Sequence, residues 1–318
     1  MSKKLKWTYG LMVGIIGLLI GFSTSRAAPS DAQITDFYSY DNNIPLNAEE
    51  SLIYEDWLMK QYSLSFDAVD GERVTGMITI PKVIWPPNPQ FPVIIYLHGY
   101  GGSAEVDPLL GDLIDFVMLF REHKYAILSL DARYHGERER DDRDIFSINF
   151  FQDKNGLSKT IIDYRRAIDY LQIRSNINEN RIFVFGISMG GIMGALLSGV
   201  DQRVNAASLV VAGGDWTELI SNSALPPADP MREALRGHYD IIPKYFDMVD
   251  PVITAHLISP RFLQMHNGTL DDIVPTGQEL YDAAGEPKEI YWYDADHYTI
   301  LLYSFDILGR SLDMFDEH

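Results

Sequence analysis

A glycine-rich turn with a single serine is the feature that most restricts how this chain can fold. Residues 186–191 read Gly-Ile-Ser-Met-Gly-Gly, between the β-branched and aromatic run 181–185 and the apolar run 192–197. This order predicts a strand, a sharp turn and a helix, with Ser188 on the turn. A residue on such a turn takes strained dihedral angles, and its neighbours must be small so that strand and helix can pack closely. The spacing therefore predicts an exposed nucleophile, with a purely structural glycine turn as the alternative.

A second glycine-rich loop follows a predicted buried strand earlier in the chain. The strand covers residues 93–97, and residues 98–103 read His-Gly-Tyr-Gly-Gly-Ser. Glycines at 101 and 102 allow the backbone to come close to a bound group. We expect His98 to orient this turn through hydrogen bonds, and a catalytic role is the alternative.

Acidic residues and a histidine follow the last two predicted strands. Residues 261–266 lead into a loop with Asp271 and Asp272, and residues 289–293 lead into His297. A serine hydroxyl is a poor nucleophile at neutral pH, so a histidine must take its proton during attack. A carboxylate then holds the histidine in the required tautomer. The chain therefore has the residue types of a nucleophilic serine site, in the order serine, aspartate, histidine.

These four segments resemble the α/β-hydrolase superfamily in their sequence and order. Residues 130–136 also match the Asp-x-Arg-x-His-Gly segment of its dienelactone-hydrolase-like, prolyl-oligopeptidase-like and acetyl-esterase-like branches, and residues 163–171 match their helix before the nucleophile. Both matching segments are expected to have structural roles. Asp131, Arg133 and His135 would form polar contacts beside the carboxyl edge of the sheet. The resemblance covers about residues 60–315.

The resemblance implies a role for each site residue. In the family pattern the acid stands three residues after the glycine of its loop, which selects Asp271 over Asp272. The implied catalytic triad is Ser188, Asp271 and His297. The oxyanion hole would be formed by the backbone N–H groups of Tyr100 and Met189.

The resemblance also implies an α/β fold with a mainly parallel sheet, helices on both faces and a helical cap inserted before the acid strand. Apolar and polar residues alternate at 62–69 and at 73–80, and this pattern predicts an N-terminal antiparallel hairpin. The expected parts are an N-terminal extension at 28–60 and a hydrolase domain at 61–318, with the cap at about 215–259. Aromatic and aliphatic cap residues are candidates to line a substrate pocket, and the alternative for each is that it packs the insertion onto the core: Trp216, Leu219, Ile220, Tyr239, Tyr245 and Phe246.

Composition excludes several other classes of protein. The chain has 318 residues, 46% of them hydrophobic, which suits one large domain. It has no cysteine, so disulfides, a thiol nucleophile and zinc–thiolate sites are excluded. A net charge of −19 argues against nucleic acid as a partner. No nucleotide-binding, haem or metalloprotease motif is present, and we expect neither cofactor nor metal.

The N-terminus resembles an export signal. Lys3, Lys4 and Lys6 precede an apolar run at 7–22, and small residues follow at 23–28. This order predicts a secretory signal cut after Ala27 and a protein in the periplasm or the medium. The alternative is an uncleaved anchor with the catalytic domain outside, which would be the protein's only membrane contact.

The combined reading is an exported serine hydrolase that cleaves carboxylic esters with small to medium acyl or acetyl groups. A serine peptidase of the oligopeptidase type, a thioesterase and an acyltransferase remain alternatives because they use the same residues. A catalytically silent binding protein is the alternative outside the enzymes, although such proteins normally lack a member of the triad.

Overall fold

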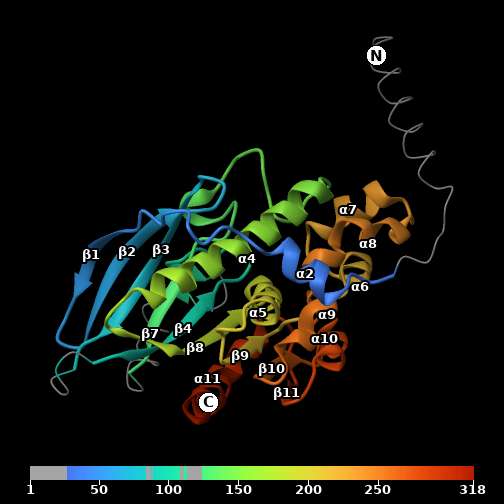
Figure 1. Ribbon diagram of the computed structural model, residues 1–318. Helices are drawn as coiled ribbons and strands as arrows, with labels where there is room; N and C mark the ends of the chain where they lie inside the picture. Colours follow the sequence, from blue (N-terminus) through green and yellow to red (C-terminus); the bar gives the residue numbers. More distant parts are fainter. Residues whose placement is uncertain (1–26, 84–86, 88, 108–110, 113–123) are drawn as a thin grey trace.

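The structure is a computed structural model that describes residues 27–83, 87, 89–107, 111–112 and 124–318. The predicted export signal therefore lies outside the described residues. Among the described residues, nine strands form one sheet in the order β1-β2-β3-β7-β4-β8-β9-β10-β11, and β5 and β6 form a separate short hairpin (Figure 1). The strands are β1 Glu49–Glu55, β2 Met59–Asp67, β3 Arg73–Pro81, β4 Phe91–Leu97, β5 Val106–Asp107, β6 Gly111–Asp112, β7 Ala126–Leu130, β8 Ile177–Ile187, β9 Ala206–Val210, β10 Phe262–Gly268 and β11 Lys288–Tyr293.

The sheet has an antiparallel part and a parallel part. Strands β1, β2 and β3 pair antiparallel, and β3 pairs antiparallel with β7. The strands from β7 to β11 in the sheet order are all parallel. This confirms the predicted mainly parallel sheet with an antiparallel hairpin, whose turn at Gly71 has a φ of +80°. The carboxyl ends of the parallel strands therefore meet at one edge of the sheet.

Helices cover both faces of the sheet, as predicted. They are α2 Asp31–Phe37, α4 Phe150–Gln172, α5 Met189–Val200, α6 Trp216–Asn222, α7 Ala228–Leu235, α8 Ile242–Phe246, α9 Pro251–Thr254, α10 Gly277–Ala283 and α11 Ser304–Glu317. The shorter 3-10 helices are η1 Gly136–Arg138, η2 Tyr239–Ile241, η3 Asp247–Val249, η4 Ala255–Ile258 and η5 Thr299–Tyr303.

Strand β4 shows why its sequence is apolar without a break. Val93 and Ile95 belong to the core shared with α4 and α5, whereas Ile94 and Tyr96 belong to a second core shared with α11. Successive side chains of a strand point to opposite faces, so a strand covered on both sides needs apolar residues at every position.

The N-terminal extension at 28–60 forms regular secondary structure and packs on the domain. It contains α2 and the edge strand β1, and its backbone is tied to α4. The guanidinium of Arg166 donates to the carbonyl oxygens of Ile44 and Pro45, and that of Arg165 donates to the carbonyl of Tyr38. These bonds fix the segment across the helix that precedes the serine strand.

The cap insertion is helical. Between β9 and β10 the chain forms α6, α7, α8 and α9 with short 3-10 turns, and α6, α7 and α8 lie together at one end of the molecule (Figure 1). The Nε1 of Trp216 donates to the carbonyl of Val249 at 2.8 Å, which links the first and last parts of the insertion.

A buried ion-pair cluster joins the hairpin, the loop after β7 and α4. The Nε of Arg133 lies 2.8 Å from Asp163, and the same carboxylate lies 2.8 Å from the guanidinium of Arg138. Both arginines also pair with Glu72 in the hairpin turn, and Arg133 pairs with Asp70. One of these residues, Arg133, was predicted from the Asp-x-Arg-x-His-Gly match to form polar bridges beside the sheet. The cluster holds three sequence-distant segments in place.

We expect Asp163→Ala to lower the free energy of unfolding by about 3–5 kcal/mol, because two buried guanidinium groups lose their shared carboxylate. Urea unfolding followed by circular dichroism measures this loss. Lys60→Ala is the control, since its pair with Glu55 is solvent-exposed and should contribute no more than about 1 kcal/mol. Equal effects of the two variants would contradict the assigned role of the cluster.

Candidate active site

Ser188 stands on a strained turn between the central strand β8 and helix α5. Its φ is 58° and its ψ is −120°, a backbone conformation that residues other than glycine rarely adopt. A Cβ atom at Gly186 would lie 2.2 Å from the carbonyl oxygen of Gly190, and one at Gly190 would lie 2.0 Å from that of Leu97. Both flanking positions therefore require glycine, as the Gly-x-Ser-x-Gly spacing predicted.

The structure brings the serine, histidine and aspartate into one hydrogen-bonded chain. The Oγ of Ser188 lies 2.8 Å from the Nε2 of His297, and the Nδ1 of His297 lies 2.8 Å from the Oδ2 of Asp271. All three side chains are buried. In this arrangement Nδ1–H donates to the carboxylate, which leaves Nε2 free to accept the serine proton.

Asp271 is held as the partner of the histidine by its own loop. Its other oxygen, Oδ1, accepts from the backbone N–H groups of Ile273 and Val274, both at 2.9 Å. These two bonds hold the carboxylate with Oδ2 toward His297. The neighbouring Asp272 is exposed and has no bond to His297 among the described contacts.

The glycine-rich loop after β4 lies beside the serine. Gly99 and Tyr100 line the same cavity as Ser188 and Met189, and Met189 is the first residue of α5. The loop is held by His98, whose Nδ1 lies 2.8 Å from the carbonyl of Gly99 and whose Nε2 accepts from Ala132 N–H at 3.1 Å. With both ring nitrogens in use and the ring fully buried, this geometry supports an orienting role for His98.

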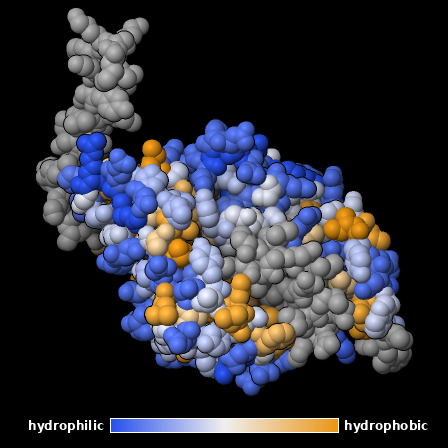
Figure 2. Space-filling view, turned by 180° about the vertical axis from the view of Figure 1, so that it is seen from behind, coloured by the Kyte–Doolittle hydropathy of each residue, from blue (hydrophilic) through white to orange (hydrophobic). Residues whose placement is uncertain are grey.

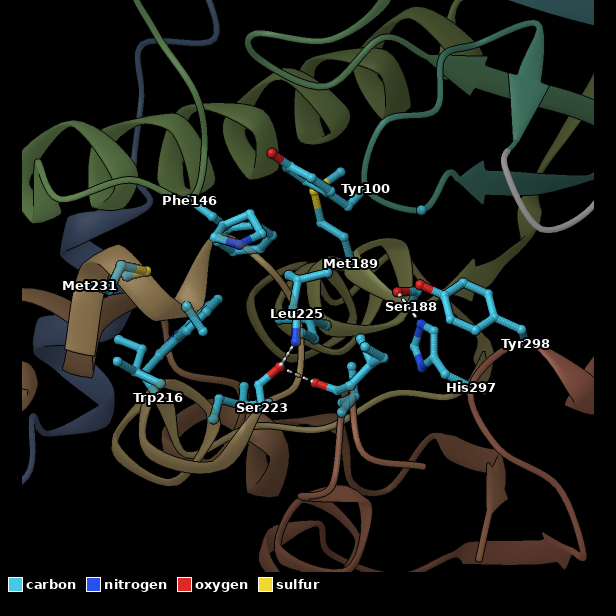
Figure 3. A pocket seen from close by; sticks show the side chains of 18 residues that line it. Tyr100, Phe146, Ser188, Met189, Trp216, Ser223, Leu225, Met231, His297 and Tyr298 are labelled. Carbon is cyan, nitrogen blue, oxygen red and sulfur yellow. Dashed lines mark hydrogen bonds between the residues drawn. The ribbon is translucent and has the colours of Figure 1, made fainter. Parts of the chain in front are cut away.

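A cavity of about 160 Å³ opens next to Ser188 (Figure 3). Two of its other polar side chains, Ser223 and Tyr100, have hydrogen-bond partners. The Oγ of Ser223 donates to the carbonyl of Ile273, and the hydroxyl of Tyr100 donates to Asp144. The remaining wall is almost entirely apolar: Phe146, Met189, Ile192, Trp216, Leu219, Ile220, Leu225, Pro227, Ala228, Met231, Ile273, Val274 and Tyr298.

The cap residues proposed from sequence divide into two groups. Trp216, Leu219 and Ile220 line the cavity. Tyr239 and Tyr245 are not among the lining residues, so the expectation for them was wrong. The ring of Tyr245 packs against Phe150 of α4, with centroids 5.8 Å apart, because α8 faces α4 rather than the serine.

Phe246 and Tyr239 do not line the cavity, and Phe246 supports its wall from outside. The ring of Phe246 lies 5.1 Å from that of Trp216, and Tyr239 is partly buried against the same core. The residues missed from sequence include Phe146, Leu225 and Met231. No local pattern marked them, because each reaches the cavity through the packing of its segment.

The segment that carries Phe146 is anchored by two acidic residues. Asp144 accepts from the hydroxyl of Tyr100 at 2.6 Å. Asp153, at the start of α4, accepts from the backbone N–H and the Oγ of Ser147 at 2.9 and 2.7 Å. Burial, against the lowering effect of the Ser147 bonds and with a smaller contribution from the nearby Asp144, raises the pKa of Asp153 to about 7.

We expect Asp153→Asn to remove part of the pH dependence of stability. The folded pKa of about 7 lies above the unfolded value, so the native protein loses stability as pH rises through 7. Asparagine can keep both bonds to Ser147 without a charge. The variant should gain about 1–3 kcal/mol relative to the parent between pH 5 and pH 8, measured by urea unfolding at each pH. A constant difference across this range would contradict the prediction.

Comparisons with known proteins identify relatives in sequence and solved structures of similar fold. The uncharacterized protein YfhR of Salmonella typhimurium is 26% identical over 272 residues, covering 83% of this chain and 80% of the relative. An acetyl xylan esterase from Paenibacillus sp. R4 superposes with a TM-score of 0.73 at 20% identity, covering 90% of this chain and 99% of the esterase. Acetyl xylan esterase 1 from Thermoanaerobacterium sp. JW/SL YS485 gives 0.72 at 16% identity, covering 92% and 96%.

At these identities the two esterases show a shared fold. The family model described as "Alpha/beta hydrolase family" matches residues 94–308, which is more than half of the chain and includes the serine, aspartate and histidine loops. The elbow at the end of β8, the strand order and this match lead to one conclusion: the chain belongs to the alpha/beta hydrolase family.

Proposed function

We propose that this protein is a serine hydrolase that cleaves carboxylic esters through an acyl-enzyme on Ser188. The observation that carries the proposal is the unbroken chain from Ser188 through His297 to Asp271, with both links at 2.8 Å, beside an apolar cavity. Esterases among the solved structures with this fold lend support.

The reaction follows from the positions of these groups. His297 takes the hydroxyl proton of Ser188 as the oxygen attacks the ester carbonyl, and the backbone N–H groups of Met189 and Tyr100 stabilise the oxyanion. The carbon–oxygen bond to the alcohol then breaks, and His297 gives its proton to the leaving oxygen. Water attacks the acyl-enzyme with His297 as base, which releases the acid and restores the serine. Asp271 stabilises the imidazolium throughout.

The cavity favours esters over peptides. A peptide chain brings N–H and C=O groups that need partners when buried, whereas the described cavity wall is apolar and its Ser223 hydroxyl already bonds to Ile273. A thioester would meet the same residues as an ester. A silent binding protein is disfavoured because Ser188, His297 and Asp271 are all present and correctly spaced.

We expect a fluorophosphonate probe to label Ser188 of residues 28–318, with the adduct located by mass spectrometry. Ser188→Ala and His297→Ala should abolish both labelling and hydrolysis of p-nitrophenyl esters. Asp271→Asn should lower kcat by about 10⁴-fold, because the imidazole loses its orienting carboxylate.

Asp272→Asn is the matched control for the acid, since it changes the next carboxylate in the same loop. It should retain activity within a few-fold, because Asp272 is exposed and does not contact the histidine. A folded protein with no adduct on Ser188 and no turnover of ester, thioester or peptide would overturn the proposed function in favour of a binding role.

We also propose that the protein is exported. Support comes from three lysines, the apolar run at 7–22 and the small residues that follow. In the part of the chain that the structure describes, no helix is long and apolar enough to cross a membrane. Expression of the full chain in a Gram-negative host should give a periplasmic protein that begins at Ala28. Mass spectrometry of the N-terminus checks this, and an uncut chain in the membrane fraction would favour the anchor.

A further inference from the structure

The position of His297 decides on which side of Ser188 each half of an ester must lie. The base that returns a proton to the leaving oxygen must be within hydrogen-bond reach of it. The alcohol therefore lies on the side of His297 and the adjacent Tyr298. Figure 3 shows these two residues with Ser188 at one end of the cavity, whereas Trp216 and Met231 lie at the other. The acyl group must consequently extend toward Trp216 and Met231.

The acyl side of the cavity is closed by helices α6 and α7. Met231 and Trp216 are only 2% and 4% exposed. The indole of Trp216 is fixed by its bond to Val249, and α7 is tied to α6 by Arg232, whose guanidinium donates to the carbonyls of Ile220 and Ser223 at 3.0 and 2.8 Å. Met231 is thus an adaptable side chain in an otherwise fixed end wall.

The alcohol side is open by contrast. Tyr298 is 59% exposed although it lines the cavity. A large alcohol group would extend past Tyr298 into solvent.

We propose that the closed apolar side binds the acyl chain, that Met231 limits its length, and that the preferred substrates are esters of medium-chain monocarboxylic acids rather than acetate esters. The inference rests on the proposed esterase function and names its substrate class. An apolar cavity of about 150 Å³ admits benzene, a six-carbon ring, and this cavity has about 160 Å³. An acyl group of about six carbons therefore fills it.

The first test is the chain-length profile of residues 28–318 on p-nitrophenyl esters from acetate to dodecanoate. Each buried methylene should raise kcat/KM by about fourfold until the cavity is full. Hexanoate has four methylenes more than acetate, so it should exceed acetate by about 250-fold, and dodecanoate should fall below hexanoate. With the hexanoyl group fixed, replacing ethanol by butanol as the leaving alcohol should change kcat/KM by less than about fivefold.

The second test changes the end wall. Met231→Ala should move the optimum two or more carbons longer, and Met231→Phe should move it shorter. Met314→Ala is the matched control: it removes an equally buried methionine from α11, which belongs to the other core and does not line the cavity. It should leave the optimum unchanged.

The outcomes separate this inference from the function on which it depends. An optimum at acetate, or an optimum that both Met231 variants leave in place, overturns the role of Met231 while ester hydrolysis stands. No hydrolysis at any chain length, with no fluorophosphonate adduct on Ser188, overturns the esterase function itself. A shift that Met314→Ala reproduces would show that the variants act through stability, which also overturns the role of Met231.

Discussion

The backbone contact between the start of α5 and the end of β4 is the constraint on which the rest of the site depends. Gly190 lies so close to the carbonyl of Leu97 that no side chain fits there, and this contact holds Ser188 at a positive φ. Strand β8 is paired on both sides, with β4 and β9, so the strained turn cannot relax by moving its strand. Because all these strands are parallel, the loops after β4, β10 and β11 reach the same edge as the serine.

Buried polar groups hold that edge together without entering the cavity. Asp131 accepts from the backbone N–H of Ala104 at 2.8 Å, and His98 bridges Gly99 and Ala132. The ion pairs around Asp163 fix the loop that follows Asp131. Oxyanion donors are effective when they need no reorganisation during the reaction. These networks supply that rigidity, which gives a physical reason for polar residues in an otherwise apolar core.

The cap and the segment before α4 shape the cavity, and the family does not specify them. The two solved structures compared above are 20% or less identical to the chain. The acyl group that each of those esterases prefers therefore does not predict the acyl group that this chain prefers. Here Phe146, Trp216 and Met231 come from three separate segments, and their rings and side chains leave an enclosed apolar space beside Ser188. The proposed chemistry lies at the sheet edge, whereas the proposed selectivity for the acyl group lies in the cap and in the segment before α4.

The sequence by itself determined the elbow and the order of the strands and loops, because each depends on local spacing: small residues at a sharp turn, apolar runs in buried strands and polar residues at their carboxyl ends. The resemblance to the α/β-hydrolase superfamily added Asp271 and His297 as the partners of Ser188. The sequence also assigned Tyr245 to the cavity, which was wrong, and it gave no sign of Met231. Only the tertiary structure decided these points, since a helical residue faces a cavity or a neighbouring helix according to how separate elements pack. Apolar periodicity records that a face is buried, but not what it is buried against.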